Sequence, residues 1–162
     1  MKIDALCVVA LIHATLSFAQ TTKSTEPAPD TLIALQRFAC ENRCAVYRLV
    51  IFADGSVIWE GRSFVKQRGL IRSGISPEAL TRLIGDLEAG GFFELHENYG
   101  YGTDSGCASI NPDGPAAILS VSNQGRSKTV LHHHRCVGPE PDRVTKLEDA
   151  VDRAVGTVKW IK

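Results

Sequence analysis

The apolar and polar positions along the chain first predict four strands. Runs rich in apolar, β-branched and aromatic residues cover Thr31–Phe38, Val46–Phe52, Ser56–Arg62 and Phe64–Ile75. The dipeptide Asp54-Gly55 between the second and third runs is typical of a two-residue hairpin turn. A turn of that length predicts a core face shared by Phe52, Val57, Val50 and Trp59.

The apolar period then changes to about 3.6 residues, which predicts a helix. Ser76 suits the N-cap and Pro77 the first turn, and Gly90-Gly91 suits the end of the helix. Its apolar stripe consists of Leu80, Leu83, Ile84 and Leu87. A second helix is predicted over Pro141–Val155, with an apolar face of Val144, Leu147, Val151 and Val155.

A second hairpin is predicted between the two helices. Its strands are Ala116–Ser122 and Arg126–Arg135, joined by the three-residue loop Asn123-Gln124-Gly125. This register predicts a core face of Leu119, Val121, Leu131 and His133. The opposite, wetter face then carries His132, His134, Ser120 and Lys128.

The predicted order is four strands, a helix, two strands and a helix. Strands and helices therefore do not alternate one by one, as they do in folds with a parallel sheet. We therefore expect an α+β fold in a single domain. It should contain an antiparallel sheet of five or six strands with two helices on one face.

The first 19 residues indicate export. Residues 1–19 combine Lys2 near the start, an apolar run and the small residues Ser17 and Ala19, as signal peptides do. Residues 20–30 are polar and proline-containing and predict a flexible linker, so the domain is expected over residues 31–162. We expect a periplasmic or secreted protein.

Charge and composition limit the classes of molecule that the protein is expected to bind. The chain has 18 basic and 18 acidic residues, and removal of residues 1–19 leaves 17 of each. A balanced charge without a basic block argues against nucleic acid. No apolar run is long enough to span a bilayer, so we expect no membrane span in the mature chain. The expected partner is an envelope protein or a surface component, which the sequence does not identify.

Four cysteines remain after the signal peptide: Cys40, Cys44, Cys107 and Cys136. An even number in an exported chain favours disulfides, with three possible pairings. Cys40–Cys44 across the first turn and Cys107–Cys136 across the Pro112–Pro115 loop are favoured. A metal site and redox-active thiols are the alternatives.

The run His132-His133-His134 is a candidate metal site. His132 and His134 lie two residues apart on one strand face, where two imidazoles can chelate Zn²⁺, Cu²⁺ or Ni²⁺. Asp104 or Cys136 is a possible further ligand. The alternative is a pair of solvated polar residues, since a site needs three or four ligands and Lys128 repels a cation.

The Gly- and Tyr-rich loop His96–Gly106 offers the remaining candidates. Ser105 could act with Asp104 and a histidine as a nucleophile, although Asp-Ser-Gly is also ordinary turn composition. Tyr99 and Tyr101 are candidate recognition residues or caps of the sheet end. A basic stretch could bind an anionic envelope component or protect an edge strand; it contains Arg62, Lys66, Arg68 and Arg72.

The order of several motifs resembles a known family. Cys40-x-x-x-Cys44 precedes Val46-Tyr47, Asp54-Gly55-x-Val57 and Gly61; Ser76-Pro77, Gly91-Phe92-Phe93, Gly156-Thr157 and Trp160 follow. Over residues 31–161 the chain is similar to the bacterial exported proteins of DUF family 6438, a domain of unknown function. Ala45 stands where that pattern has proline, and Asn111–Pro115 is an insertion. The resemblance implies an exported α+β domain and no particular activity.

The sequence lacks a complete catalytic set, so we expect a non-enzymatic binding or structural module of the bacterial envelope that needs no cofactor. The first alternative is a transition-metal-binding protein that uses His132 and His134. The second is a small hydrolase-like enzyme with its site in loop 96–106.

Overall fold

The structure is a computed structural model that describes residues 27–41, 43–111 and 113–162. The predicted signal peptide and residues 20–26 of the predicted linker lie outside the described residues. The last residues of that linker are hydrogen-bonded, because the Thr31 amide donates to the Ala28 carbonyl oxygen.

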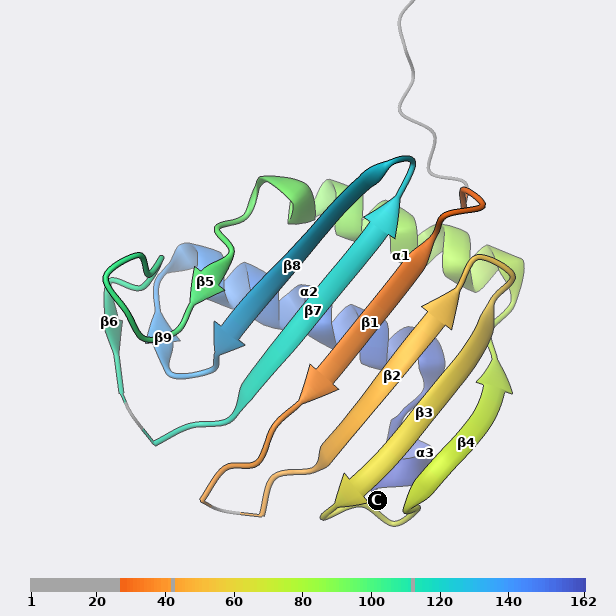
Figure 1. Cartoon of the computed structure of the whole chain (residues 1–162), viewed down its shortest axis with the longest axis horizontal. Coiled ribbons are helices and arrows are strands. Elements are labelled where there is room, and N and C mark those ends of the chain that lie inside the picture. Colours follow the sequence, from red (N-terminus) through yellow and green to blue (C-terminus); the bar gives the residue numbers. More distant parts are fainter. Residues whose placement is uncertain (1–26, 42, 112) are drawn as a thin grey trace, which may run out of the picture.

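A twisted sheet of seven strands forms one layer of the fold (Figure 1). In spatial order its strands are β4 (Gly69–Gly74), β3 (Ser56–Ser63), β2 (Val46–Phe52), β1 (Leu32–Arg37), β7 (Ala116–Asn123), β8 (Arg126–His133) and β5 (Asn98–Tyr99). All neighbours are antiparallel except β5, which pairs with β8 in parallel. The α+β fold is therefore confirmed, with a larger and mixed sheet.

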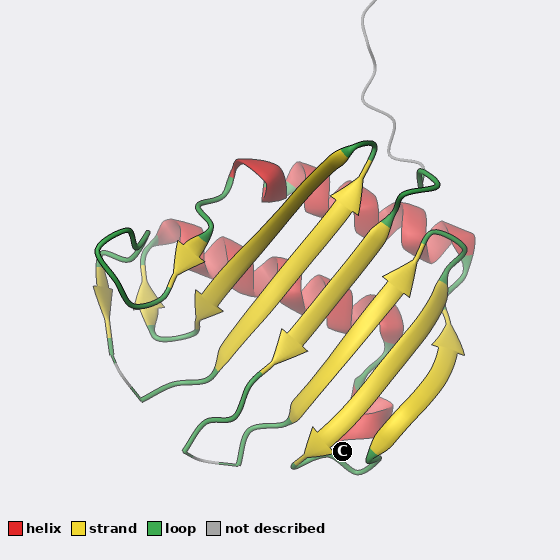
Figure 2. Cartoon of the chain, viewed as in Figure 1, coloured by secondary structure: helices red, strands yellow, loops and turns green. Residues whose placement is uncertain are grey.

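Two long helices cover one face of this sheet, and the other face is open (Figure 2). Helix α1 (Pro77–Ala89) begins where predicted, because the Ser76 hydroxyl accepts a hydrogen bond from the Ala79 amide. Helix α2 (Pro139–Val155) ends at Gly156, which has a left-handed conformation, and a short helix α3 (Val158–Ile161) follows. Both predicted apolar stripes are buried against the sheet.

The smaller elements lie near one end of the sheet. A 3₁₀ turn (Phe92–Glu94) follows α1, and strands β6 (Ser109–Ile110) and β9 (Cys136–Val137) form a separate two-stranded ladder.

Disulfides join Cys40 to Cys44 and Cys107 to Cys136, the pairs favoured from the sequence. Within the described residues, no helix is both long and apolar enough to cross a membrane.

The first hairpin has a longer turn than predicted. Three residues, 53–55, connect its strands, and Gly55 adopts φ 79° while its carbonyl oxygen accepts from the Ile75 amide. The extra residue shifts the register, so Ile51 pairs with Val57 and Leu49 with Trp59. The predicted core positions Val50 and Phe52 therefore lie on the open face.

The second hairpin has a shorter turn than predicted, Gln124-Gly125, between the paired residues Asn123 and Arg126. Both turn residues have positive φ, 53° and 70°. The Asp30 carboxylate accepts hydrogen bonds from the amides of both, at 3.2 and 2.7 Å. A side chain from before β1 thus stabilises a left-handed glutamine, and nothing within the hairpin itself reveals that contact.

This register reverses the predicted faces of β8. Val130 and His132 point to the helices, opposite Leu119 and Ala117, whereas Leu131 is exposed on the open face. The prediction that His132 occupies the wetter face is therefore wrong, because one residue of register moves every side chain of a strand to the other face.

The register generates a direct test. Val130→Ala removes a fully buried side chain and should lower the free energy of unfolding by about 2 kcal/mol. Leu131→Ala removes a larger but 38% exposed side chain and should cost less than about 1 kcal/mol. Urea denaturation of both variants measures the two changes. A larger loss for Leu131→Ala contradicts the two-residue turn.

Candidate functional site

A buried polar cluster lies between the sheet and helix α2. Glu148 on α2 is 0% exposed and accepts hydrogen bonds from two imidazoles. The donors are His132 Nδ1 at 2.9 Å and His134 Nε2 at 2.7 Å. The Arg37 guanidinium donates to the same carboxylate at 3.0 Å. Residues from β1, the end of β8 and α2 therefore meet at one carboxyl group.

Local structure explains this meeting. Arg37 follows Ile33 and Leu35 on the core face of β1, and His132 lies on the core face of β8. His134 follows β8 in a turn, where its amide donates to the Pro115 carbonyl oxygen. Glu148 lies one helical turn after Val144, within the buried stripe of α2.

Arg37 connects this carboxylate to a second one. Its guanidinium donates to Asp152 at 2.8 and 3.0 Å, and also to Asp149 at 3.3 Å. The Tyr47 hydroxyl donates to Asp152 at 2.6 Å, and so does the Thr157 hydroxyl at 3.0 Å. The guanidinium is therefore surrounded by three carboxylates of α2.

Burial and these contacts shift the pKa values of the cluster. Burial alone raises the pKa of Glu148, but the hydrogen bonds from His132 and His134 and the charge of Arg37 outweigh it and lower the pKa to about 2. Burial raises the pKa of Tyr47, and the neighbouring Asp152 raises it further. Burial opposes the charge of Arg37 and is the largest single effect, yet Asp152, Tyr47 and Glu148 together outweigh burial and raise the pKa. Glu148 is therefore ionised and Tyr47 neutral at physiological pH.

The cluster carries excess negative charge. Glu148, Asp149 and Asp152 supply three negative charges and Arg37 one positive charge, so the net charge is minus two while both imidazoles are neutral. His132 Nδ1 and His134 Nε2 each face an oxygen of Glu148 that can only accept, so a proton on each of these nitrogens completes the contact. A divalent cation bound at these nitrogens, with each imidazole keeping its proton on its other nitrogen, would bring the net charge to zero.

A cavity of about 440 Å³ opens beside the cluster. His134, Arg37 and Asp152 form part of its wall, so the cluster is accessible from solvent on this side. The rest of the lining is mainly apolar and consists of Phe38, Cys44, Ala45, Tyr47, Pro115, Ala116, Thr145, Asp149 and Ile161.

The three histidines of the run separate. The rings of His132 and His134 lie 4.6 Å apart under the sheet. His133 is on the opposite face, where its ring lies 5.3 Å from that of Tyr101. The pair named from the sequence is thus brought together, but in a buried place rather than on a solvated face. Neither Asp104 nor Cys136 joins it, since Asp104 lies beside His96 and Cys136 is in a disulfide.

Loop 96–106 is less open than expected. Tyr99 is fully buried, and its hydroxyl donates to Glu140 at 2.8 Å and accepts from the His96 amide. Its proposed role on a recognition surface is therefore wrong, whereas Tyr101 is exposed. The Ser105 hydroxyl donates to the Gly100 carbonyl oxygen at 2.6 Å, and not to an imidazole. Ser105 thus lacks the contact that would activate it as a nucleophile.

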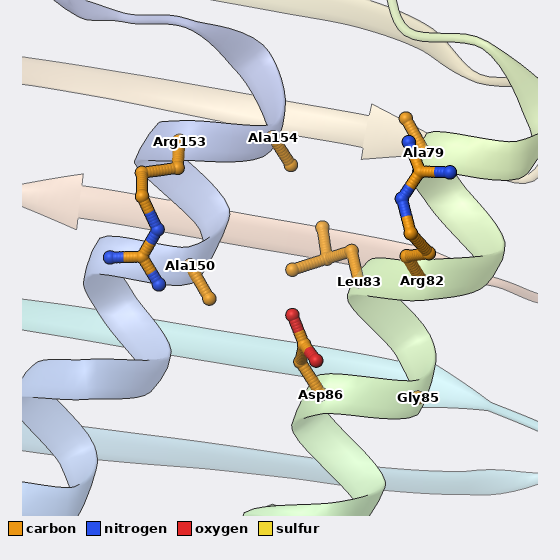
Figure 3. A pocket seen from close by; sticks show the side chains of 8 residues that line it. All are labelled: Ala79, Arg82, Leu83, Gly85, Asp86, Ala150, Arg153 and Ala154. Atoms are coloured by element: carbon orange, nitrogen blue, oxygen red, sulfur yellow. The ribbon is translucent and has the colours of Figure 1, made fainter.

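Another hollow, of about 400 Å³, lies between α1 and α2 (Figure 3). Its charged residues, Arg82, Asp86 and Arg153, are all exposed. The remaining lining is Ala79, Leu83, Gly85, Ala150 and Ala154. This groove lacks buried polar groups that would fix a ligand, so the cluster at Glu148 is the better candidate site.

Sequence reasoning missed Arg37 and Glu148. Each interrupts an apolar pattern: Arg37 continues the core alternation of Ile33 and Leu35, and Glu148 lies inside the stripe that contains Val144 and Leu147. A charge at a core position requires a buried partner. That signal was available, although it does not say which charges meet.

The burial of Glu148 predicts a large stability effect. In the presence of EDTA, Glu148→Gln should lower the free energy of unfolding by about 3 kcal/mol, because it leaves Arg37 without one buried partner. Asp149→Asn is a matched control on the same helix; its side chain is 52% exposed and the change should cost less than about 1 kcal/mol. Urea denaturation compares them, and equal losses would contradict a buried network.

The buried hydroxyl of Tyr99 should make the free energy of unfolding depend on pH at alkaline pH. Burial, and then the hydrogen bond to Glu140, raise its pKa to about 12 from the ordinary value of 10. The folded state thus favours the neutral phenol, and this stabilisation is complete below pH 10 and is lost as the pH rises to about 12. Tyr99→Phe should lose about 1 kcal/mol at pH 7 and show a smaller further loss between pH 9 and 11. Urea denaturation at each pH measures the free energy of unfolding. An equal fall with pH in the unmodified protein and in Tyr99→Phe would contradict the raised pKa of Tyr99.

Comparison with known proteins gives a family and no activity. No curated protein matches the chain. The sequence profile described as "Domain of unknown function (DUF6438)" matches residues 31–155, which include Arg37, His132, His134 and Glu148. The chain therefore belongs to the DUF6438 family.

Proposed function

We propose that the protein is an exported binding module that holds a divalent transition-metal ion with His132, His134 and Glu148. One observation carries the proposal: His132, His134 and Glu148 each offer a donor atom, and these atoms all lie within 4.8 Å of one another. The sequence named His132 and His134 as candidate ligands, and the fold brings Glu148 within hydrogen-bond distance of both.

The donor atoms of these three residues suit Zn²⁺ and similar divalent transition-metal ions. Imidazole nitrogen and carboxylate oxygen are ordinary ligands of Zn²⁺, Cu²⁺ and Ni²⁺. Donor atoms around a tetrahedral zinc lie about 3.3 Å apart, as bonds of about 2.0 Å require. His132 Nδ1 lies 2.9 Å from Oε1, so this pair would open by about half an ångström to admit an ion. His134 Nε2 faces Oε2 at 2.7 Å and would turn toward the same ion, since the three donor atoms lie within 4.8 Å of one another.

Arg37 approaches this site from the side of Oε2 of Glu148. Its Nη1 donates to Oε2 and lies 3.4 Å from Nε2 of His134, whereas His132 faces Oε1. Oε1 can therefore bind an ion while Arg37 holds the carboxylate in place, the role that neighbouring hydrogen-bond partners play for metal ligands. Asp149 and Asp152 offset the charge of the guanidinium, which lowers its repulsion of a cation.

Three protein ligands leave a coordination position open. The cavity beside His134 gives an ion and a small ligand access to that position. We propose binding rather than catalysis, because the two hydroxyls of the described cavity lining, those of Tyr47 and Thr145, donate to Asp152 and to the Pro141 carbonyl oxygen and not to an imidazole.

Export remains part of the proposal. The pattern of residues 1–19 supports it, and the disulfides Cys40–Cys44 and Cys107–Cys136 suit an oxidising compartment. A periplasmic or secreted module that acts at the bacterial envelope agrees with both features.

The test is a Zn²⁺ titration of metal-free protein by calorimetry. We expect one ion per chain, and an affinity at least about tenfold lower in His134→Ala and in Glu148→Gln, because each change removes one ligand. Co²⁺ substitution should give the absorption of a four-coordinate ion. Circular dichroism establishes that each variant is folded.

His96→Ala is the matched control, because His96 is a partly exposed histidine of the same chain outside the cluster. Its affinity should equal that of the unmodified protein. No binding of Zn²⁺, or an equal loss in the His96 variant, contradicts the proposal.

A further inference from the structure

A third hollow, the basic hollow, lies where the loop between β1 and β2 meets the turn between β3 and β4. Its volume is about 420 Å³, and its lining residues are Arg43, Phe64, Val65, Arg68 and Ile161. Ile161 also lines the cavity beside the histidines, so the two hollows are neighbours.

Two residues of this hollow adopt a rare backbone conformation. Arg43 has φ 56° and Phe64 has φ 53°, the left-handed region that bulky residues seldom occupy. The disulfide Cys40–Cys44 closes the loop around Arg43, and the Gln67 amide donates to the Trp160 carbonyl oxygen at 3.0 Å. Such strain persists only where the surroundings hold it, and it is commonest at functional sites.

These conformations bring a cation and an aromatic ring together at the surface. The guanidinium carbon of Arg43 lies 5.6 Å from the centre of the Phe64 ring. Phe64 is 46% exposed, an unusual position for a phenylalanine. Arg43 is therefore oriented by a cation–π contact, while the ring keeps part of its surface free for a ligand.

The described lining of the hollow is basic and includes no carboxylate side chain. Arg43 and Arg68 are exposed, and no ion pair involves either of them in the part of the chain that the structure describes. Arg62, by contrast, is paired with Glu60 at 3.4 Å. Two guanidiniums without counter-charges, in one hollow, favour an anion.

We propose that this hollow binds a phosphate group, with Arg43 and Arg68 as its donors and Phe64 against the carbon skeleton that carries it. The guanidinium presents paired N–H donors that match the oxygens of a phosphate. The ligand class is an organic phosphate, either a free phosphate ester or the headgroup of an anionic lipid. The inference goes beyond metal binding and does not depend on it.

The test uses the purified protein with both disulfides formed, in EDTA, so that a bound metal cannot supply the phosphate site. Two probes distinguish the sources: glycerol 3-phosphate in solution, and phosphatidylcholine vesicles with or without phosphatidic acid. Amide NMR shifts follow the first, and co-sedimentation follows the second. We expect saturable binding of at least one probe, about tenfold weaker in Arg43→Gln and in Arg68→Gln, and weakened by salt.

Arg72→Gln is the matched control, because Arg72 is an exposed arginine of β4 that does not line the hollow. It should bind as the unmodified protein does. Binding to vesicles alone, lost in the Arg43 and Arg68 variants, supports the proposal and assigns the phosphate to a lipid. Absence of saturable binding to either probe, or an equal loss in Arg72→Gln, overturns it.

Discussion

The burial of one carboxylate, Glu148, constrains the rest of the structure. A charged group without water is stable only when hydrogen-bonded cations or N–H donors surround it. Glu148 obtains these from Arg37 on β1 and from His132 and His134 at the end of β8. The central strands and helix α2 are thereby fixed relative to one another by polar contacts, which are directional, in addition to apolar packing, which is not.

The same constraint gives the site its chemical character. Three carboxylates of α2 exceed the charge of Arg37, so the cluster favours a cation, while the neighbouring hollow at Arg43 and Arg68 favours an anion. Cys44 lines the cavity beside His134 and Arg43 lines the basic hollow, so the loop closed by the Cys40–Cys44 disulfide contributes to both. Two groups of residues with opposite charge therefore adjoin at one end of the sheet.

The two hairpins show that sequence patterns predict the presence of a hairpin but not its strand register. Both were predicted, and both registers were wrong by one residue, in opposite directions. Asp54-Gly55 is typical of a two-residue turn, yet Gly55 belongs to a three-residue loop whose carbonyl oxygen bonds the Ile75 amide. Gln124-Gly125 forms the tighter turn because Asp30, far away in sequence, accepts from both amides. Turn length depended on partners that local sequence does not contain.

The sequence by itself determined the α+β class, the two long helices with their apolar stripes, the Ser76 cap of α1 and the Gly156 end of α2, and it named the histidine pair as candidate metal ligands. These features depend on periodicity and on neighbours a few residues apart. The start of α2 lies two residues before the predicted Pro141. Only the tertiary structure decided the strand registers, the burial of His132 and the meeting of Arg37 with Glu148. Those residues lie 111 positions apart, and their contact follows from the packing of α2 beneath β1. The sequence pattern shows which charged residues occupy core positions, such as Arg37 and Glu148. The tertiary structure alone decides which of them contact one another.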